Sequence, residues 1–211
     1  AASGMSLVGI RGRAMAEAAT QAQTGMSAVV GGVEADVLAR LAELDLTPAN
    51  YNGAGQIVAA GDLVALAALS AEAPRGTRVV PLQVAGAFHT RYMEPARAAL
   101  ATAVDELVAS GAVQDPTTTL WTNSDGTTVA SGNRALELLV GQVASPVRWD
   151  LCMQSFADSG ITGLVELTPG GTLVGLAKRA LRGVPAVAVK TPDDLSAAVA
   201  LLTDDAPKEN S

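Results

Sequence analysis

The chain has a single cysteine, Cys152, and a single histidine, His89, in 211 residues. One cysteine excludes a disulfide framework, and one of each cannot supply a zinc site built from cysteine and histidine. No apolar stretch approaches the roughly 20 residues that span a membrane. The first five residues have neither the basic segment nor the apolar core of a secretory signal. The sequence therefore predicts a soluble, cytoplasmic protein that uses no metal and no bound cofactor.

Aromatic residues are scarce, at 3%, and basic residues are outnumbered: 14 Lys and Arg stand against 21 Asp and Glu, which gives a net charge of −7. An acidic surface repels polyphosphate, so we expect no nucleic-acid partner. Hydrophobic residues still make up 49% of the chain, which is enough for a substantial core. With so few aromatic rings, that core must consist mostly of Ala, Val and Leu.

The segment from Met26 to Val84 shows alternating strand and helix patterns. Strands are predicted at 26–30, 48–52, 56–60 and 78–84, and helices at 33–44 and 62–71. Asp62 is a plausible N-cap for the second helix. The order β-α-β-β-α-β is the split arrangement of a ferredoxin-like unit.

The flanking regions follow a different pattern. Helices are predicted at 6–22, 95–110, 134–143, 147–158, 172–181 and 193–202, with strands at 118–122, 163–167 and 186–189. Strands that alternate with helices imply a parallel sheet covered on both faces. We therefore predict an α/β fold in which a ferredoxin-like subdomain is inserted into a larger domain. The limits are 25–84 for the subdomain, 1–24 and 85–204 for the large domain, and 205–211 for a disordered tail.

Five short motifs occur in a fixed order around this insertion. They are Arg11-Gly12-Arg13-Ala14-Met15, Asn50 to Gln56, Gly86-Ala87-Phe88-His89, Gln142 to Trp149, and Glu166 through Pro169-Gly170-Gly171 to Leu173. Each is weak alone, but together, over about residues 6–202, they resemble the malonyl-CoA:acyl carrier protein transacylases. The resemblance implies a partial hydrolase-like parallel-sheet domain that carries the ferredoxin-like subdomain. It also implies transfer of malonyl from malonyl-CoA to the phosphopantetheine thiol of acyl carrier protein, in fatty acid biosynthesis.

In that family a serine on a Gly-x-Ser-x-Gly elbow attacks the thioester and forms a malonyl-serine intermediate. No serine of this chain stands in such a pattern, and only ten residues precede Arg11. We therefore expect a fragment or a truncated reading frame, with a large domain incomplete on its amino-terminal side. Such a chain should be inactive alone, and monomeric when complete.

The resemblance gives three residues a direct role. It makes His89 the general base, because the reaction needs a group that titrates near neutrality beside a hydroxyl. Arg11 corresponds to the arginine that holds the free carboxylate of malonyl with two parallel donors. Phe88 would crowd an α-methyl group and so favour malonyl over methylmalonyl units. Without the resemblance, these residues would be interpreted as a packed or surface histidine, an exposed helix arginine and a core aromatic.

Two further residues have weaker implied roles. Gln142 corresponds to a glutamine whose backbone carbonyl orients the histidine, although an ordinary helix-end glutamine would look the same. Asn52 resembles an asparagine that lines the substrate cleft, whereas an asparagine before glycine is usually a turn former.

The turn at 169–171 and the single cysteine each allow a functional and a purely structural interpretation. The turn Pro169-Gly170-Gly171 either cradles an anion at the following helix or only reverses the chain. Cys152 lies in an apolar helical context without a companion base, which favours a buried, inert thiol.

A basic cluster at Lys178, Arg179 and Arg182 is a candidate docking site for acyl carrier protein, since such carriers are generally acidic; it also fits a solvated helix face. Two other functions remain open. One is a non-catalytic module that binds acyl-CoA or carrier protein, and the other is a loading acyltransferase of polyketide synthesis.

Overall fold

The computed structural model describes residues 2–203, so the tail predicted at 205–211 lies outside the described residues. Sheets and helices occur together, which confirms the mixed α/β class. The chain divides into two compact units, with the boundary between Cys152 and Met153, inside helix α6 (Trp149–Asp158). Within 2–203, no helix combines the length and the apolar character needed to cross a bilayer.

A five-stranded sheet forms the centre of the first unit. Its order is β4 (Thr77–Pro81), β1 (Thr24–Gly31), β3 (Gln56–Asp62), β2 (Thr47–Gly53) and β5 (Val147–Arg148). The first four strands pair antiparallel, and β5 adds a short parallel pairing to β2. The order of elements from β1 to β4 is the β-α-β-β-α-β order predicted from the sequence.

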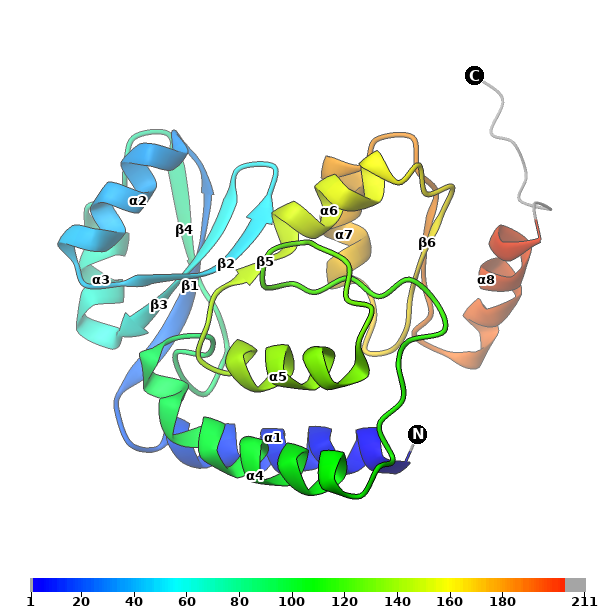
Figure 1. Cartoon of the computed structure of the whole chain (residues 1–211). Coiled ribbons are helices and arrows are strands. Elements are labelled where there is room, and N and C mark those ends of the chain that lie inside the picture. Colours follow the sequence, from blue (N-terminus) through cyan, green and yellow to red (C-terminus); the bar gives the residue numbers. More distant parts are fainter. Residues whose placement is uncertain (1, 204–211) are drawn as a thin grey trace. The chain divides into compact units, whose positions relative to one another are not determined.

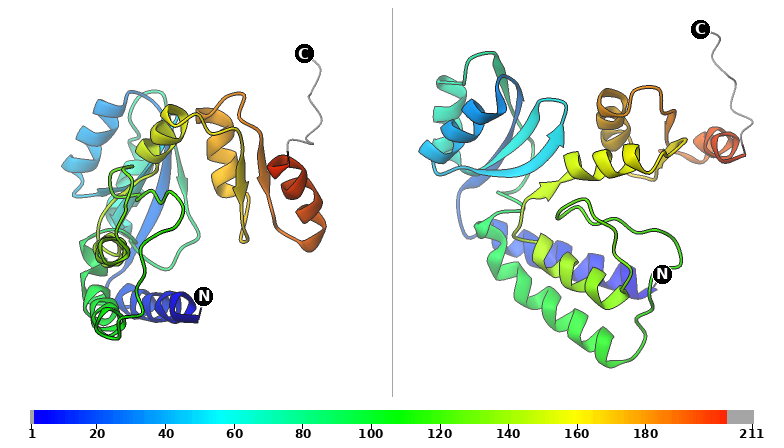
Figure 2. Two further views of the ribbon diagram at one scale, coloured as in Figure 1. Left: turned by 45° about the vertical axis from the view of Figure 1, so that its right-hand side comes forward. Right: turned by 45° about the horizontal axis from the view of Figure 1, so that its top comes forward.

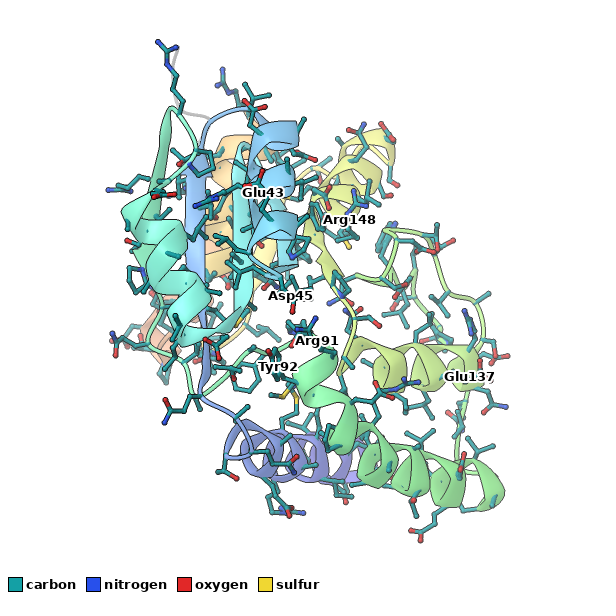
Figure 3. The ribbon with its side chains drawn as sticks, turned by 90° about the vertical axis from the view of Figure 1, so that its left-hand side faces the viewer. Glu43, Asp45, Arg91, Tyr92, Glu137 and Arg148 are labelled. Atoms are coloured by element: carbon teal, nitrogen blue, oxygen red, sulfur yellow. The ribbon has the colours of Figure 1, made fainter. Side chains whose placement is uncertain are left out.

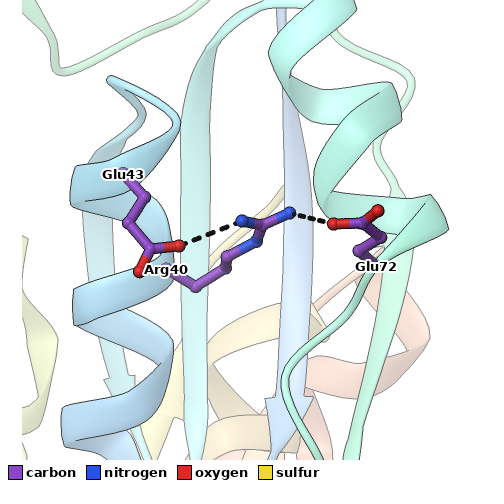
Figure 4. A network of polar contacts seen from close by, with 3 residues as sticks. All are labelled: Arg40, Glu43 and Glu72. Atoms are coloured by element: carbon purple, nitrogen blue, oxygen red, sulfur yellow. Dashed lines mark hydrogen bonds and ion pairs between the residues drawn. The ribbon is translucent and has the colours of Figure 1, made fainter.

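Helices α2 (Glu34–Glu43) and α3 (Leu63–Ala71) cover one face of this sheet (Figure 1). Asp62 caps α3, since its side chain accepts a hydrogen bond from Val64 N at 2.8 Å, which confirms the predicted N-cap. Arg40 on α2 lies between Glu43 and Glu72, at 3.0 and 2.8 Å, and so joins the two helices (Figure 4).

Side chains of the central strands alternate between two cores. Val29 and Ile57 pack against α2 and α3, together with Leu41 and Leu69 of those helices. Alternate positions on the same strands, among them Val58, face the other way and pack with Ala87 and Phe88. The second core therefore anchors the segment that carries His89 against the sheet.

Helices α1 (Ala2–Ala19), α4 (Glu94–Ala109) and α5 (Gly132–Gln142) form a separate layer of the first unit (Figure 2). Met15 of α1 packs with Leu100 and Val104 of α4, whose spacing of four places them on one helix face. Met93, in the short helix η1 (Arg91–Met93) just before α4, is fully buried in the same cluster.

The strand predicted at 118–122 is wrong. The described residues show only an isolated bridge between Trp121 and Thr128 there. Thr122 N bonds to Thr127 O at 2.9 Å and Gly126 N bonds to Thr122 O at 2.9 Å, so the segment closes on itself as a tight loop. The helix predicted at 147–158 also starts later, because its first two residues form β5.

The second unit contains two parallel strands and the helices that follow them. They are β6 (Leu164–Glu166), α7 (Thr172–Ala180), β7 (Ala186–Ala188), the short helix η2 (Pro192–Asp194) and α8 (Leu195–Leu202). Strands β6 and β7 pair in parallel around the connection through α7. The parallel sheet expected in this region thus has two strands within the described residues. The domain limits stay a prediction.

Candidate active site

His89 lies in a tight loop between β4 and η1, and its backbone adopts a left-handed conformation with φ of 62°. The loop is fixed at its start by Ala87 N, which donates to Thr24 Oγ1 at 3.0 Å. Gly86 lies so close to α1 that an added Cβ would be 2.9 Å from the Cβ of Ala19. Only a glycine fits there, so Gly86 sets how near the loop comes to the helix.

Thr90 fixes the other side of the same turn. Its buried hydroxyl donates to Ala87 O at 2.6 Å and accepts from Tyr92 N at 3.2 Å. Arg91 points toward Asp45 of the α2–β2 turn (Figure 3), and its Nη1 lies 2.9 Å from Asp45 Oδ1. Left-handed residues other than glycine are strained and persist where the surroundings determine them. The bonds of Thr90 and Arg91 supply such surroundings for His89.

The imidazole of His89 is held through one of its nitrogens. Nδ1 lies 2.9 Å from the backbone carbonyl oxygen of Gln142, which can only accept a hydrogen bond. Nδ1 must therefore carry the proton in neutral His89, and Nε2 keeps the lone pair of a base. Burial lowers the pKa of His89, and the charge of Arg11 lowers it further, whereas the hydrogen bond to the Gln142 carbonyl raises it. The net effect is a pKa below the ordinary value of 6.5. The ring is thus neutral at pH 7.

Arg11 extends from α1 and acts electrostatically on His89. Its guanidinium is half-buried, and burial lowers the pKa of Arg11. None of the ion pairs found within residues 2–203 involves Arg11. A half-buried cation without an acidic partner, next to a neutral histidine, can receive an anionic ligand. Arg13, two residues further on, is exposed.

The structure brings four of the five expected site residues together. Gln142 bonds to His89 through its backbone carbonyl, and Arg11 acts on His89 electrostatically. Phe88 precedes His89 in the chain and packs, half-buried, against both the helical core and the sheet core. Asn52 lies apart in the β2–β3 hairpin, where its amide is 3.4 Å from Gln56 Oε1. Within residues 2–203 there is no group of three or more His, Cys, Asp or Glu placed to hold a metal ion.

Two mycobacterial proteins are similar in sequence to this chain. A protein of Mycobacterium tuberculosis strain H37Rv called malonyl CoA-acyl carrier protein transacylase is 52% identical over 191 residues, 90% of this chain and 62% of the relative. One of Mycolicibacterium smegmatis with the same name is 50% identical over 193 residues, 90% of this chain and 65% of the relative. No protein-family model matches the chain.

This chain is related to the malonyl-CoA:acyl carrier protein transacylases. The crystal structure of the M. tuberculosis transacylase, at 52% identity, matches with a TM-score of 0.85 over 90% of this chain and 62% of that one. The Xanthomonas oryzae transacylase matches with a TM-score of 0.81 at 34% identity, over 93% and 63%. The resemblance read from the five motifs is confirmed. The chain spans a little under two thirds of the length of these relatives.

The fifth motif, which begins at Glu166, holds the backbone at the start of α7. The buried carboxylate of Glu166 accepts hydrogen bonds from Gly171 N at 2.7 Å, Leu173 N at 2.9 Å and Val174 N at 3.0 Å. Burial raises the pKa of Glu166, but these three donors and Lys190 lower it, and the net shift is downward. The start of α7 therefore already holds an anion, and that anion is the chain's own side chain.

Sequence reasoning missed Glu166, Thr24 and Thr90 as individual residues. The motif pointed to the turn at 169–171 and not to the carboxylate that fills it. Thr24 and Thr90 bracket His89 from 65 residues before and one residue after, and only the second gave a local signal, as a threonine just before a helical turn.

The structure also shows the surroundings of the single cysteine and of the basic cluster. Cys152 is buried, as predicted; its thiol donates to Thr122 O at 3.4 Å, and burial raises its pKa to about 11. The side chains of the basic cluster, Lys178, Arg179 and Arg182, are all exposed at the end of α7, in the second unit.

Proposed function

We propose that this chain supplies the base and the carboxylate-binding arginine of an acyltransferase that moves malonyl from malonyl-CoA to acyl carrier protein. The observation that carries the proposal is the His89 arrangement: a neutral imidazole fixed at Nδ1 by Gln142 O, with its Nε2 available and Arg11 beside it. A base of lowered pKa is deprotonated at neutral pH, as general-base catalysis requires. The relatives' names support malonyl as the group transferred.

In the proposed reaction, Nε2 of His89 takes the proton of a serine hydroxyl as the serine oxygen bonds to the thioester carbon. Collapse of the tetrahedral adduct breaks the carbon–sulfur bond, and the imidazolium returns the proton to the departing thiolate of coenzyme A. The carrier's thiol then gives its proton to His89 and attacks the malonyl-serine ester, and His89 reprotonates the serine. No Gly-x-Ser-x-Gly occurs in this chain, so we assign the serine to the part of the relatives outside the match.

Arg11 is proposed to bind the free carboxylate of malonyl. Its guanidinium can form two parallel charge-assisted hydrogen bonds, which a lysine cannot reproduce. Phe88 is proposed to limit the space beside the acyl α-carbon, because its ring is fixed between two cores. Both roles predict selection for malonyl over larger or uncharged acyl groups.

The proposed partner is acyl carrier protein, with the exposed basic cluster Lys178, Arg179 and Arg182 as its docking residues. A cytoplasmic location belongs to the same proposal, since a single buried cysteine suits a reducing compartment. In an active, completed enzyme, replacing all three basic residues by glutamate should raise the KM for carrier protein and leave the KM for malonyl-CoA unchanged.

The deciding experiment follows radiolabelled malonyl from malonyl-CoA to carrier protein. It compares the chain with a chimaera that adds the part of the M. tuberculosis relative outside the match. We expect activity only in the chimaera, and a loss of on the order of a thousandfold in its His89→Ala variant. Arg11→Lys should raise the activation free energy that corresponds to kcat/KM for malonyl-CoA by about 2–4 kcal/mol, with little effect on acetyl-CoA.

Two results would contradict the proposal. Activity of the chain alone would mean that another residue is the nucleophile. A folded chimaera that binds malonyl-CoA without turnover would favour a non-catalytic binding module.

A further inference from the structure

The side chain of Gln142 is buried at the last residue of α5, and it makes two hydrogen bonds of its own. Nε2 lies 2.8 Å from Ser145 O and 2.9 Å from Pro146 O. Both partners are carbonyl oxygens that only accept, so the amide nitrogen must face them. The other amide atom, Oε1, is buried without a partner in the described residues. Burying an amide oxygen without a hydrogen-bond donor costs stability. We therefore expect the two hydrogen bonds of Nε2 to have a functional role that offsets this cost.

The same residue touches His89 through its backbone. A helix leaves its last carbonyl groups without helical donors, which makes the carbonyl of Gln142 available to Nδ1 of His89. The peptide group that carries this carbonyl also contains Val143 N, whose own bond to Val140 O is long, at 3.4 Å. That bond holds the peptide plane only loosely.

We propose that the Gln142 side chain is a positioning residue for His89. By tying the helix end to the 145–146 turn, it aims the Gln142 carbonyl at Nδ1 and so selects the tautomer with a free Nε2. The importance of that tautomer rests on the proposed function, but its selection by Gln142 does not. The carbonyl remains in every variant, so a substitution tests the side chain alone.

The test is an NMR titration of the 211-residue chain, in which the single histidine gives one set of imidazole signals. Carbon and nitrogen shifts of the ring report which nitrogen carries the proton. We expect the Nδ1–H form to dominate in the unchanged chain. Gln142→Met, of similar volume and without donors, should lower the ratio of Nδ1–H to Nε2–H tautomer by about fivefold. The pKa of His89 should also fall, because the carbonyl that raises it is less well aimed.

Two matched variants separate positioning from general damage. Val143→Ala opens a cavity at the adjacent, fully buried residue and should lower the melting temperature without changing the tautomer ratio. Gln154→Met removes an exposed glutamine and should change neither the melting temperature nor the tautomer ratio. An unchanged tautomer ratio in folded Gln142→Met overturns the proposal.

If Gln142→Met does not fold, Gln142→Asn decides. Its amide is one methylene shorter and cannot reach both carbonyls from the same backbone, so an unchanged ratio there overturns the proposal as well. Because no substrate is involved, a correct tautomer shift together with an inactive chimaera would count against the proposed function alone.

Discussion

Burial acts on the two rarest side chains of this protein in opposite ways, because one is an acid and the other a base. For Cys152 it disfavours the thiolate and raises the pKa to about 11, and for His89 it disfavours the imidazolium and lowers the pKa. The first change makes the thiol inert, whereas the second leaves the imidazole ready to accept a proton at pH 7.

The inertness of Cys152 can be measured with iodoacetamide, which reacts with thiolates. At pH 8 a pKa near 11 leaves about 100-fold less thiolate than an ordinary cysteine has. We expect alkylation of the native chain to be at least that much slower than in 8 M urea, as followed by mass spectrometry. Rapid labelling of the native chain would show that the thiol is accessible and ionised.

The lowered pKa of His89 also predicts how stability depends on pH. Well above 6.5, the ordinary pKa of histidine, His89 is neutral in both folded and unfolded chains. As pH falls below that value, the unfolded chain takes up a proton that the folded chain resists, so the free energy of unfolding decreases. Urea unfolding at pH 7.5 and 5.5 should show a smaller decrease in His89→Gln than in the unchanged chain. Equal decreases would mean that the folded pKa is not lowered.

Among the elements, α7 depends on a residue from the strand before it. Removing the Glu166 carboxylate leaves three backbone N–H groups at the start of α7 without their acceptor. Glu166→Ala should therefore cost about 2 kcal/mol in urea unfolding. Asp193→Ala, which removes one exposed carboxylate from the same unit, is the control and should cost less than about 0.5 kcal/mol.

The Glu166 effect should also vanish in acid. Since its folded pKa lies below the ordinary value near 4.5, its contribution is present above that pH and is lost as pH falls through the folded pKa. A penalty for Glu166→Ala that persists well below this range would instead indicate lost packing.

Local sequence patterns predicted most helices and strands, but not the tertiary hydrogen bonds that their residues make. The hairpin around Gly53–Gly55 and the Asp62 cap follow from residues close in sequence, and both are present. The segment 118–122 has strand-like residues, yet its backbone bonds go to its own loop, which no periodicity reveals. Likewise, the site residues came from motif order, whereas the bond between Thr24 and the His89 loop is a tertiary contact between residues far apart in the sequence.

At the scale of the whole molecule, charge should control solubility. The chain carries a net charge of −7 at pH 7 and has an isoelectric point near 4.6. Repulsion between copies disappears near the isoelectric point, so turbidity should be greatest close to pH 4.6 and low at pH 7. A maximum near neutrality would point to attraction between apolar surfaces rather than to loss of charge.

The left-handed backbone of His89 sets stability against activity at one position. Glycine adopts that conformation without strain, so His89→Gly removes the proposed base while relieving the backbone. A library selected only for resistance to heat or protease should therefore lose the histidine. A library of the chimaera selected for growth that depends on malonyl transfer should keep it, and the difference in its frequency would measure how strongly chemistry, against folding, maintains the residue.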